Sequence, residues 1–331
     1  MPVFRHQGRW RSKLEDQTLA GDLKVGLIGA GRIGLPIATR ISQAGFKVVV
    51  VDVAQERLAE AGSRGLETAT DTEHLVGTDV VFVVVAKPSQ VLEVLEKEPF
   101  VSGRMAGTLF VVVSTIGPAA IRKAEPAARR CGVVLVDCPV TGGVDRAESG
   151  DLTLFVSGAS DVIDNLRPVL SPVGALVVCG TRAGDGQSFK MVNNMLAVTN
   201  LVAAAEALAF ASRLGLDREQ LLDVLPNGTA ASWMLSDRGR RLVGPASERL
   251  DASIYLEILA KDAALVVETA EAVGFPAPVA EVVRQQWQQA VEMGLGRYDD
   301  TAIIETYAVH PDHHSVTSEA VLRSASDALA G

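Results

Sequence analysis

The segment GDGQSFKMVNN, residues 184–194, places a lysine and an amide where they can act together. Lys190 and Asn194 are four residues apart, so on a helix both side chains lie on one face. Two glycines precede them and a long apolar stretch follows, which predicts that Lys190 lies near the start of a helix. A cation there is disfavoured by the helix dipole, so a solvated surface lysine explains the position poorly. The spacing predicts that both side chains address one bound group.

The segment GLIGAGRIG contains glycines at the spacing G-x-G-x-x-G, namely Gly29, Gly31 and Gly34. The first glycine permits a tight turn, the second lets a pyrophosphate approach the backbone, and the third lets helix and strand pack closely. A second apolar run ends at Asp52, where a carboxylate can accept both ribose hydroxyls. A glycine-rich turn that binds nothing would not need Asp52. The pattern predicts a dinucleotide site that prefers NAD over NADP, because this carboxylate would repel a 2′-phosphate.

A second glycine-containing segment, DCPVTGG, follows another apolar run. Its last residues, Thr141, Gly142 and Gly143, can expose backbone N–H groups and a hydroxyl to an anion. The same residues would also form an ordinary tight loop, so this segment alone leaves both interpretations open.

Composition and charge narrow the functional classes. The chain has 331 residues, 48% hydrophobic and 21% charged, which is typical of a globular protein with two domains. Its net charge of −9 argues against general nucleic-acid binding, which needs a basic surface. The first 20 residues are basic and polar, without the apolar segment of a secretory signal, and the most apolar runs have strand length. We expect a cytoplasmic protein that binds neither nucleic acid nor membrane.

The cysteines and histidines do not predict a metal site. Cys131, Cys138 and Cys179 are too few for a disulfide framework and lack the spacing of metal ligands. Each lies in or beside an apolar run, which favours buried thiols; a nucleophilic Cys138 is disfavoured because no histidine is near it in sequence. The tail segment HPDHHS holds three of the five histidines and Asp312, but no cysteine and no frame of further carboxylates accompanies them, so we expect a solvated tail.

Strand and helix patterns alternate in the first half of the chain, and helical patterns alone follow Gly184. Continuous Val, Ile and Leu runs separated by amphipathic segments predict a parallel sheet covered on both faces. The longest helix is expected from about 185 to 214, closed by Gly215. We expect four parts: an N-terminal extension (1–22), a Rossmann-type dinucleotide-binding domain (23–184), an all-helical substrate and oligomerisation domain (185–308) and a tail (309–331). The long helix would join the two domains, with the active site between them.

Taken together, these motifs resemble those of the β-hydroxyacid dehydrogenase family, which includes 3-hydroxyisobutyrate dehydrogenases and tartronate semialdehyde reductases. The resemblance covers roughly residues 23–308. It rests on GLIGAGRIGLPIA, on DCPVTGG, on GDGQSFKMVNN and on the pair Lys261-Asp262, in the family's order. The chain departs from the family where Thr141 replaces the usual serine and where AKPS puts Lys87 beside Pro88.

The resemblance implies roles for individual residues. Lys190 would transfer a proton and Asn194 would orient the substrate. The residues implied in substrate binding are Thr141, Gly142, Gly143, Trp233 and Asp262. The residues implied in cofactor binding are Gly29, Gly31, Arg32, Ile33, Gly34, Asp52, Lys87, Pro88, Thr115 and Lys261.

The implied activity is an NAD-dependent, reversible oxidation of a short 3-hydroxycarboxylic acid to the 3-oxo acid or semialdehyde. Three alternatives are an imine-reducing relative, a decarboxylating relative and a catalytically silent NAD-binding module. Imine reducers usually lack the lysine, decarboxylating sugar-phosphate relatives have a much longer helical domain, and a silent module should have lost Lys190 or Asn194. The apolar helical domain also predicts a homodimer or homotetramer.

Overall fold

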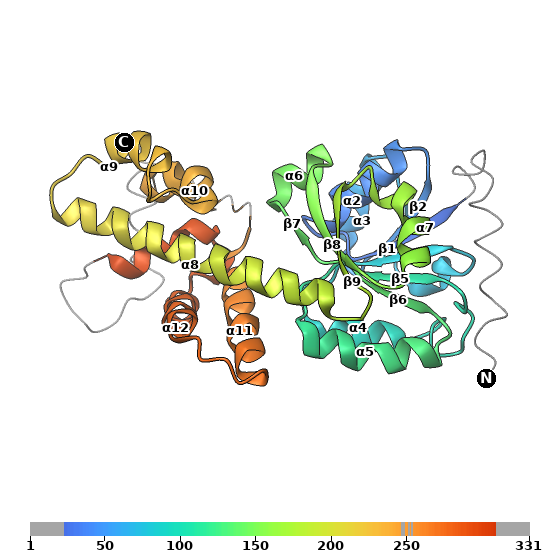
Figure 1. The fold of residues 1–331 in the computed structure, drawn as a ribbon. Coiled ribbons are helices and arrows are strands. Elements are labelled where there is room, and N and C mark those ends of the chain that lie inside the picture. The colour runs from blue at the N-terminus through green and yellow to red at the C-terminus, as the bar shows by residue number, and fades with distance from the viewer. Residues whose placement is uncertain (1–22, 246–248, 251, 253, 309–331) are drawn as a thin grey trace. The chain divides into compact units, whose positions relative to one another are not determined.

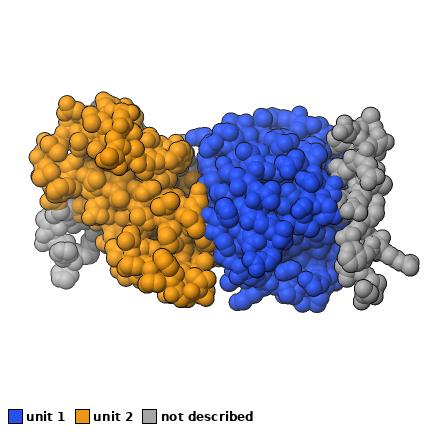
Figure 2. Space-filling model, viewed as in Figure 1, with its two compact units in different colours: residues 1–190 blue, residues 191–331 orange. Residues whose placement is uncertain are grey.

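The computed structural model describes residues 23–245, 249–250, 252 and 254–308 (Figure 1). The N-terminal extension and the histidine-containing tail therefore lie outside the described residues. The chain divides into two compact units, residues 1–190 and 191–331, coloured separately in Figure 2. The division falls inside helix α8 (Asp185–Arg213), of which residues 185–190 belong to the first unit.

The described part of the first unit contains one nine-stranded sheet in the order β3-β2-β1-β4-β5-β6-β8-β7, with β9 beside β8. The strands from β3 to β6 are parallel, whereas β8 runs antiparallel to β6 and β7 and parallel to β9. The strands are β1 (Lys24–Ile28), β2 (Lys47–Val51), β3 (Glu67–Ala69), β4 (Val80–Val83), β5 (Leu109–Val112), β6 (Val134–Asp137), β7 (Val140–Thr141), β8 (Leu152–Ser157) and β9 (Gly174–Gly180).

Helices cover both faces of this sheet, because its central strands carry apolar side chains on both sides. One face packs against α2 (Gly34–Gln43), α3 (Gln55–Ser63), α6 (Gly143–Ser149) and α7 (Ser160–Leu170). The other face packs against α4 (Pro88–Leu95) and α5 (Pro118–Arg130), drawn below the sheet in Figure 1. A short 3₁₀ helix, η2 (Thr72–Leu75), adds Leu75 to this second core.

The second unit is helical throughout its described residues. Besides most of α8 it contains α9 (Arg218–Val224), α10 (Trp233–Val243), α11 (Leu256–Ala272) and α12 (Pro278–Glu292), and the 3₁₀ helices η3 (Leu225–Asn227), η5 (Leu295–Arg297) and η6 (Asp300–Tyr307). Trp287 is fully buried at its centre, and its indole N–H donates to the carbonyl of Val198 at 3.3 Å. This bond ties α12 to α8.

The expected fold class is confirmed. The long helix predicted for about 185–214 is α8, and Gly215 follows it with φ +73°. No strand occurs in the described residues after β9, only an isolated bridge between Tyr255 and Asp299. Strand β3 and helix α10 are among the elements that the sequence patterns did not single out. Strand β3 has three residues, and α10 is rich in charged residues, which hid its buried side.

Helix α10 is held by a buried ion pair rather than by an apolar face alone. Arg238 is 6% exposed, and its Nε lies 3.1 Å from both carboxylate oxygens of Asp300, which is fully buried at the start of η6. Arg241 also pairs with buried Asp299. Since a buried charge without a partner is costly, these pairs fix α10 against η6.

By length and composition, α8 is the one helix in the described part of the chain that could cross a membrane. Core helices of soluble proteins have the same composition. In α8 the apolar residues Val198, Leu201, Ala205 and Leu208 are buried in the core of the second unit.

Replacing Trp287 tests how far the second unit depends on this packing. Trp287→Ala removes a fully buried indole and should destabilise the protein by about 3–5 kcal/mol, the range for large-to-small changes in cores. Trp233→Ala is the matched control, because this tryptophan is 52% exposed and should change the unfolding midpoint little. Equal shifts of the two thermal unfolding midpoints, followed by circular dichroism, would contradict the described core.

Candidate active site

The glycines after β1 lie where the parallel order reverses, since β1 is flanked by β2 and β4. Gly29 has φ +99°, and a Cβ on it would lie 2.1 Å from the carbonyl oxygen of Val84. A Cβ on Gly34 would lie 2.0 Å from the carbonyl oxygen of Gly29. Gly31 has open space, with nothing within 4 Å of such a Cβ. The outer glycines are thus required by packing, and the middle one leaves the backbone open to a pyrophosphate, which fits a dinucleotide.

Asp52 follows β2 at the same edge and is bonded to the glycine loop. Its Oδ2 accepts a hydrogen bond from the N–H of Ala30 at 2.7 Å, and its Oδ1 accepts one from Ala54 at 2.9 Å. Each carboxylate oxygen can accept a second bond, so Asp52 retains capacity for ribose hydroxyls. The adjacent loop residues Arg32 and Ile33 are half-buried, and Ile33 packs against the first core.

The loops after β4 and β5 bring three further predicted cofactor residues to this edge. Lys87 is exposed and precedes α4, which begins at Pro88. Thr115 is half-buried in the loop after β5. The neighbouring Ser114 hydroxyl accepts a hydrogen bond from the N–H of Val85 at 2.7 Å and donates to the carbonyl of Val83, which joins the two loops.

The predicted anion nest lies at the end of β7. Thr141 pairs with Thr153 of β8, and the next two residues have left-handed backbones, φ +135° at Gly142 and φ +78° at Gly143. A Cβ on Gly143 would meet nothing within 4 Å. All three residues are partly exposed, so a small anion can reach this backbone.

A buried polar cluster centred on Asp137, to which the sequence analysis assigned no role, anchors α8 to the sheet. Asp137 is fully buried at the end of β6. Its Oδ2 accepts hydrogen bonds from the backbone N–H groups of Gly184 and Gln187, both at 3.0 Å, and from the Ser157 hydroxyl at 3.2 Å. Its Oδ1 accepts one from Gln187 Nε2 at 3.0 Å. Burial raises the pKa of Asp137, and these four hydrogen bonds oppose that rise.

Gln187 extends this cluster to the loop that carries Thr115. Its Oε1 accepts hydrogen bonds from the N–H groups of Ile116 and Gly117, both at 3.0 Å, and its Nε2 donates to the carbonyl of Ser114 at 3.1 Å. The signal in the sequence was Asp137 within the apolar run VVLVDCPV, since a charged residue is buried only with partners, whereas Gln187, between Gly186 and Ser188, gave no such signal.

Lys190 and Asn194 lie one turn apart on α8, as the spacing predicted, and both are buried, at 8% and 4% exposure. Lys190 is therefore not a solvated surface lysine. Asn194 Oδ1 accepts a hydrogen bond from Asn193 at 3.0 Å. Its buried Nδ2 has no hydrogen-bond partner among the described residues. A buried donor of this kind is expected to bind a ligand or water.

The other predicted residues lie in the second unit. Trp233 begins α10 and is 52% exposed, with the Arg238 guanidinium 5.8 Å from its ring centre. On α11, Lys261 Nζ lies 3.0 Å from Oδ1 of buried Asp262.

The cysteines agree largely with the expectation of buried thiols. Cys131 and Cys138 are buried and Cys179 is half-buried. Burial raises the pKa of all three thiols, to about 11 for Cys179. A high pKa leaves little nucleophilic thiolate, so Cys138 is unsuited to nucleophilic catalysis.

Comparison with known proteins identifies the family. Residues 24–181 match the NAD binding domain of 6-phosphogluconate dehydrogenase, and residues 184–307 match the NAD-binding family of NADP-dependent 3-hydroxyisobutyrate dehydrogenase. L-threonate dehydrogenase of Escherichia coli O6:H1 is 33% identical over 87% of this chain and 95% of that enzyme. NAD-dependent L-serine dehydrogenase of Pseudomonas aeruginosa is 28% identical over 85% of this chain and 96% of that enzyme.

A solved structure gives the same result. The crystal structure of 3-hydroxyisobutyrate dehydrogenase from Salmonella typhimurium is 28% identical, with a TM-score of 0.78 over 86% of this chain and all of that one. The two matched segments correspond to the sheet-containing part of the chain and to α8 with the helices that follow it. The chain therefore belongs to the 3-hydroxyisobutyrate dehydrogenase, or β-hydroxyacid dehydrogenase, family of NAD(P)-dependent oxidoreductases acting on CH–OH groups.

Proposed function

We propose that this protein reversibly oxidises a short 3-hydroxycarboxylic acid with NAD, with Lys190 as general acid and base. The observation that carries the proposal is the buried pair on α8, Lys190 and Asn194, in which the amide Nδ2 is buried and unsatisfied within the described residues. A bound nicotinamide would accept the hydride from the carbinol carbon. Relatives named for L-threonate and L-serine support a small hydroxy acid as the substrate class.

In this reaction each of the candidate site residues has a distinct role. Lys190 takes the hydroxyl proton in oxidation and returns it in reduction, while Asn194 donates from Nδ2 to the same oxygen. A lysine must be neutral to accept a proton, and both its burial and the positive charge of oxidised nicotinamide favour the neutral amine. The Thr141–Gly143 nest would hold the carboxylate, with Trp233 and Asp262 assigned to the substrate by the family resemblance.

The cofactor residues follow the same assignment. Gly29, Gly31 and Gly34 receive the pyrophosphate, together with backbone groups of Arg32 and Ile33. Asp52 binds the ribose, Lys87 and Pro88 lie by the middle of the cofactor, and Thr115 and Lys261 lie by its nicotinamide end. The reaction draws on an intracellular NAD(H) pool, which fits the cytoplasmic location expected from the sequence.

The proposal is tested by replacing the base. On the most active acid from a panel of 3-hydroxyisobutyrate, glycerate, L-threonate, L-serine and phenylserine, Lys190→Ala should lower kcat by roughly 10²–10⁴-fold, as for a lost general base. Asn194→Ala should cause a smaller loss, mainly in substrate binding. NADH should still bind both variants, as measured by fluorescence titration.

The matched control is Lys123→Ala, because Lys123 is an exposed lysine on α5. It should retain full activity. If Lys190→Ala also retained near-full turnover, the base would lie elsewhere, and Lys261 would be the next residue to replace.

Cofactor preference is expected to depend on Asp52. The wild-type protein should show a higher kcat/KM for NAD than for NADP, because the carboxylate would repel the 2′-phosphate. Asp52→Asn keeps one acceptor oxygen and removes the charge, so it should reduce this preference. A wild-type preference for NADP would show that Asp52 does not face the ribose, and Lys87 would then be the candidate partner of the phosphate.

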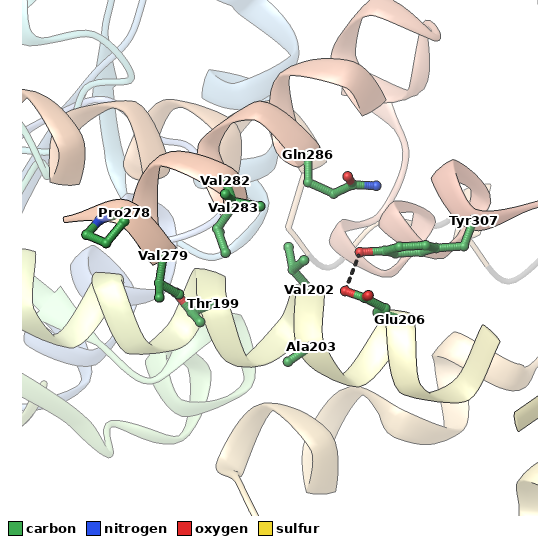
Figure 3. A pocket seen from close by; sticks show the side chains of 10 residues that line it. All are labelled: Thr199, Val202, Ala203, Glu206, Pro278, Val279, Val282, Val283, Gln286 and Tyr307. Carbon is green, nitrogen blue, oxygen red and sulfur yellow. Dashed lines mark hydrogen bonds between the residues drawn. The ribbon is translucent and has the colours of Figure 1, made fainter. Parts of the chain in front are cut away.

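We propose further that the second unit forms a homodimer or homotetramer through an apolar groove. The groove, about 600 Å³, lies between α8 and α12 and ends at Tyr307 of η6, whose hydroxyl donates to Glu206 at 3.4 Å (Figure 3). Val279 and Val282 are 64% and 65% exposed on its α12 side. The apolar face continues along α8, where Leu196 is 60% and Phe210 63% exposed. So much exposed apolar surface favours a second copy as its partner.

Size-exclusion chromatography with light scattering tests this interface. The wild-type protein should be a dimer or tetramer at micromolar concentration, and the double variant Val279→Asp/Val282→Asp should shift to lower mass. Val101→Asp is the control, because Val101 is 55% exposed in the first unit and should leave the mass unchanged. A monomeric wild-type protein would overturn the proposal.

A further inference from the structure

We propose that Asp137 and Gln187 are positioning residues, which together hold Lys190 in register with the loop 114–117. The inference rests on the role proposed above for Lys190. Asp137 opens the segment DCPVTGG and Gln187 lies within GDGQSFKMVNN, but the sequence analysis assigned neither of them a role, and both are fully buried.

The side-chain amide of Gln187 forms four hydrogen bonds, three with the loop 114–117 and one with Asp137. Its oxygen accepts from two consecutive backbone N–H groups, Ile116 and Gly117, and its nitrogen donates to Ser114 and to Asp137. An amide carries both an acceptor and donors, and few other side chains of this length could satisfy all four partners. Gln187 therefore fixes the loop that carries Thr115 against α8.

Asp137 fixes the start of the helix itself. The first N–H groups of a helix have no partner within the helix, and here those of Gly184 and Gln187 donate to Asp137. The N–H of Gly186 donates to the Ser157 hydroxyl, which in turn donates to Asp137. All four groups that hydrogen-bond to the carboxylate are donors, so these bonds favour its ionised form and oppose the effect of burial. The negative charge of Asp137 is favourable at the N-terminal end of α8. The positive charge of Lys190 without it would be unfavourable there.

The anchor is close enough to Lys190 to set its position. Gln187 and Lys190 are three residues apart, so they lie about 4.5 Å apart along the helix axis and on neighbouring positions of its surface. A shift of the first turn therefore moves the lysine nitrogen. A misplacement of about 1 Å can cost on the order of 10²-fold in rate, because proton and hydride transfer need aligned groups.

The test is Gln187→Met in the full chain, which keeps the side-chain length and removes all four hydrogen bonds. The control is Thr108→Val, which removes a different buried hydrogen bond of the same unit, from Thr108 Oγ1 to the carbonyl of Thr78 at 3.1 Å, at the opposite end of β5. Without any ligand, Gln187→Met should speed hydrogen–deuterium exchange at 114–117 and 184–190 together, and Thr108→Val should not.

Kinetics provide the second measurement. With NAD and the most active acid of the panel, Gln187→Met should lower kcat by about 10- to 100-fold and raise the primary deuterium isotope effect, with NADH affinity unchanged. In the Lys190→Ala background the same change should cause no further loss, since residues that act as a unit are not additive. If Gln187→Met does not fold, Ser157→Ala should give a smaller loss in the same direction.

Two results would overturn the inference. In the first, Gln187→Met matches Thr108→Val both in hydrogen–deuterium exchange and in kcat, which would mean that Gln187 has only a structural role. In the other, the Gln187→Met and Lys190→Ala losses multiply, and Gln187 acts independently of the lysine. A failure of the proposed function would give a different result from either of these. Lys190→Ala alone would retain turnover, while Gln187→Met would still speed hydrogen–deuterium exchange at 114–117 and 184–190 together.

Discussion

The buried carboxylate of Asp137 is the constraint on which the site depends. It lies at the end of β6 and accepts four hydrogen bonds, three of them from Gly184 and Gln187 at the start of α8. A hydrogen bond to a charged group typically contributes about 1.5–3 kcal/mol, so the helix start has little freedom to move. The same interaction explains how a lysine is tolerated in the first turns of α8, because a negative charge there opposes the helix dipole.

The other candidate residues of the first unit lie in loops at the carboxyl ends of parallel strands. The glycine loop follows β1, Asp52 follows β2, Lys87 follows β4 and Thr115 follows β5. Hydrogen bonds between neighbouring loops, such as that from Val85 to Ser114, keep this edge together. Through Gln187 the edge is joined to α8, which then continues into the helical unit and carries Asn194. The loops proposed to bind the cofactor and the proposed proton-transfer residue, Lys190, are thus joined by one set of hydrogen bonds.

The parts of this arrangement that depend on local sequence could be predicted. The glycine spacing, the strand runs and the 185–214 helix each follow from residues close together in the chain, and the structure has them at those positions. The Asp137–Gln187 contact joins residues 50 apart, so no local pattern shows it. The burial of Arg238 on α10 likewise depends on Asp300, 62 residues later. Spacing could predict that Lys190 and Asn194 share a face, but only the fold shows that both are buried.

Proton transfer by the Lys190 amine is tested most directly by chemical rescue. Lys190→Ala should regain part of its turnover when small primary amines such as methylamine are added, because they can occupy the vacated space and accept the proton. The rescued rate should follow the basicity of the amine, as expected for general base catalysis. Turnover of Lys190→Ala that is already close to wild type without any amine, and unchanged by adding one, would contradict the claim.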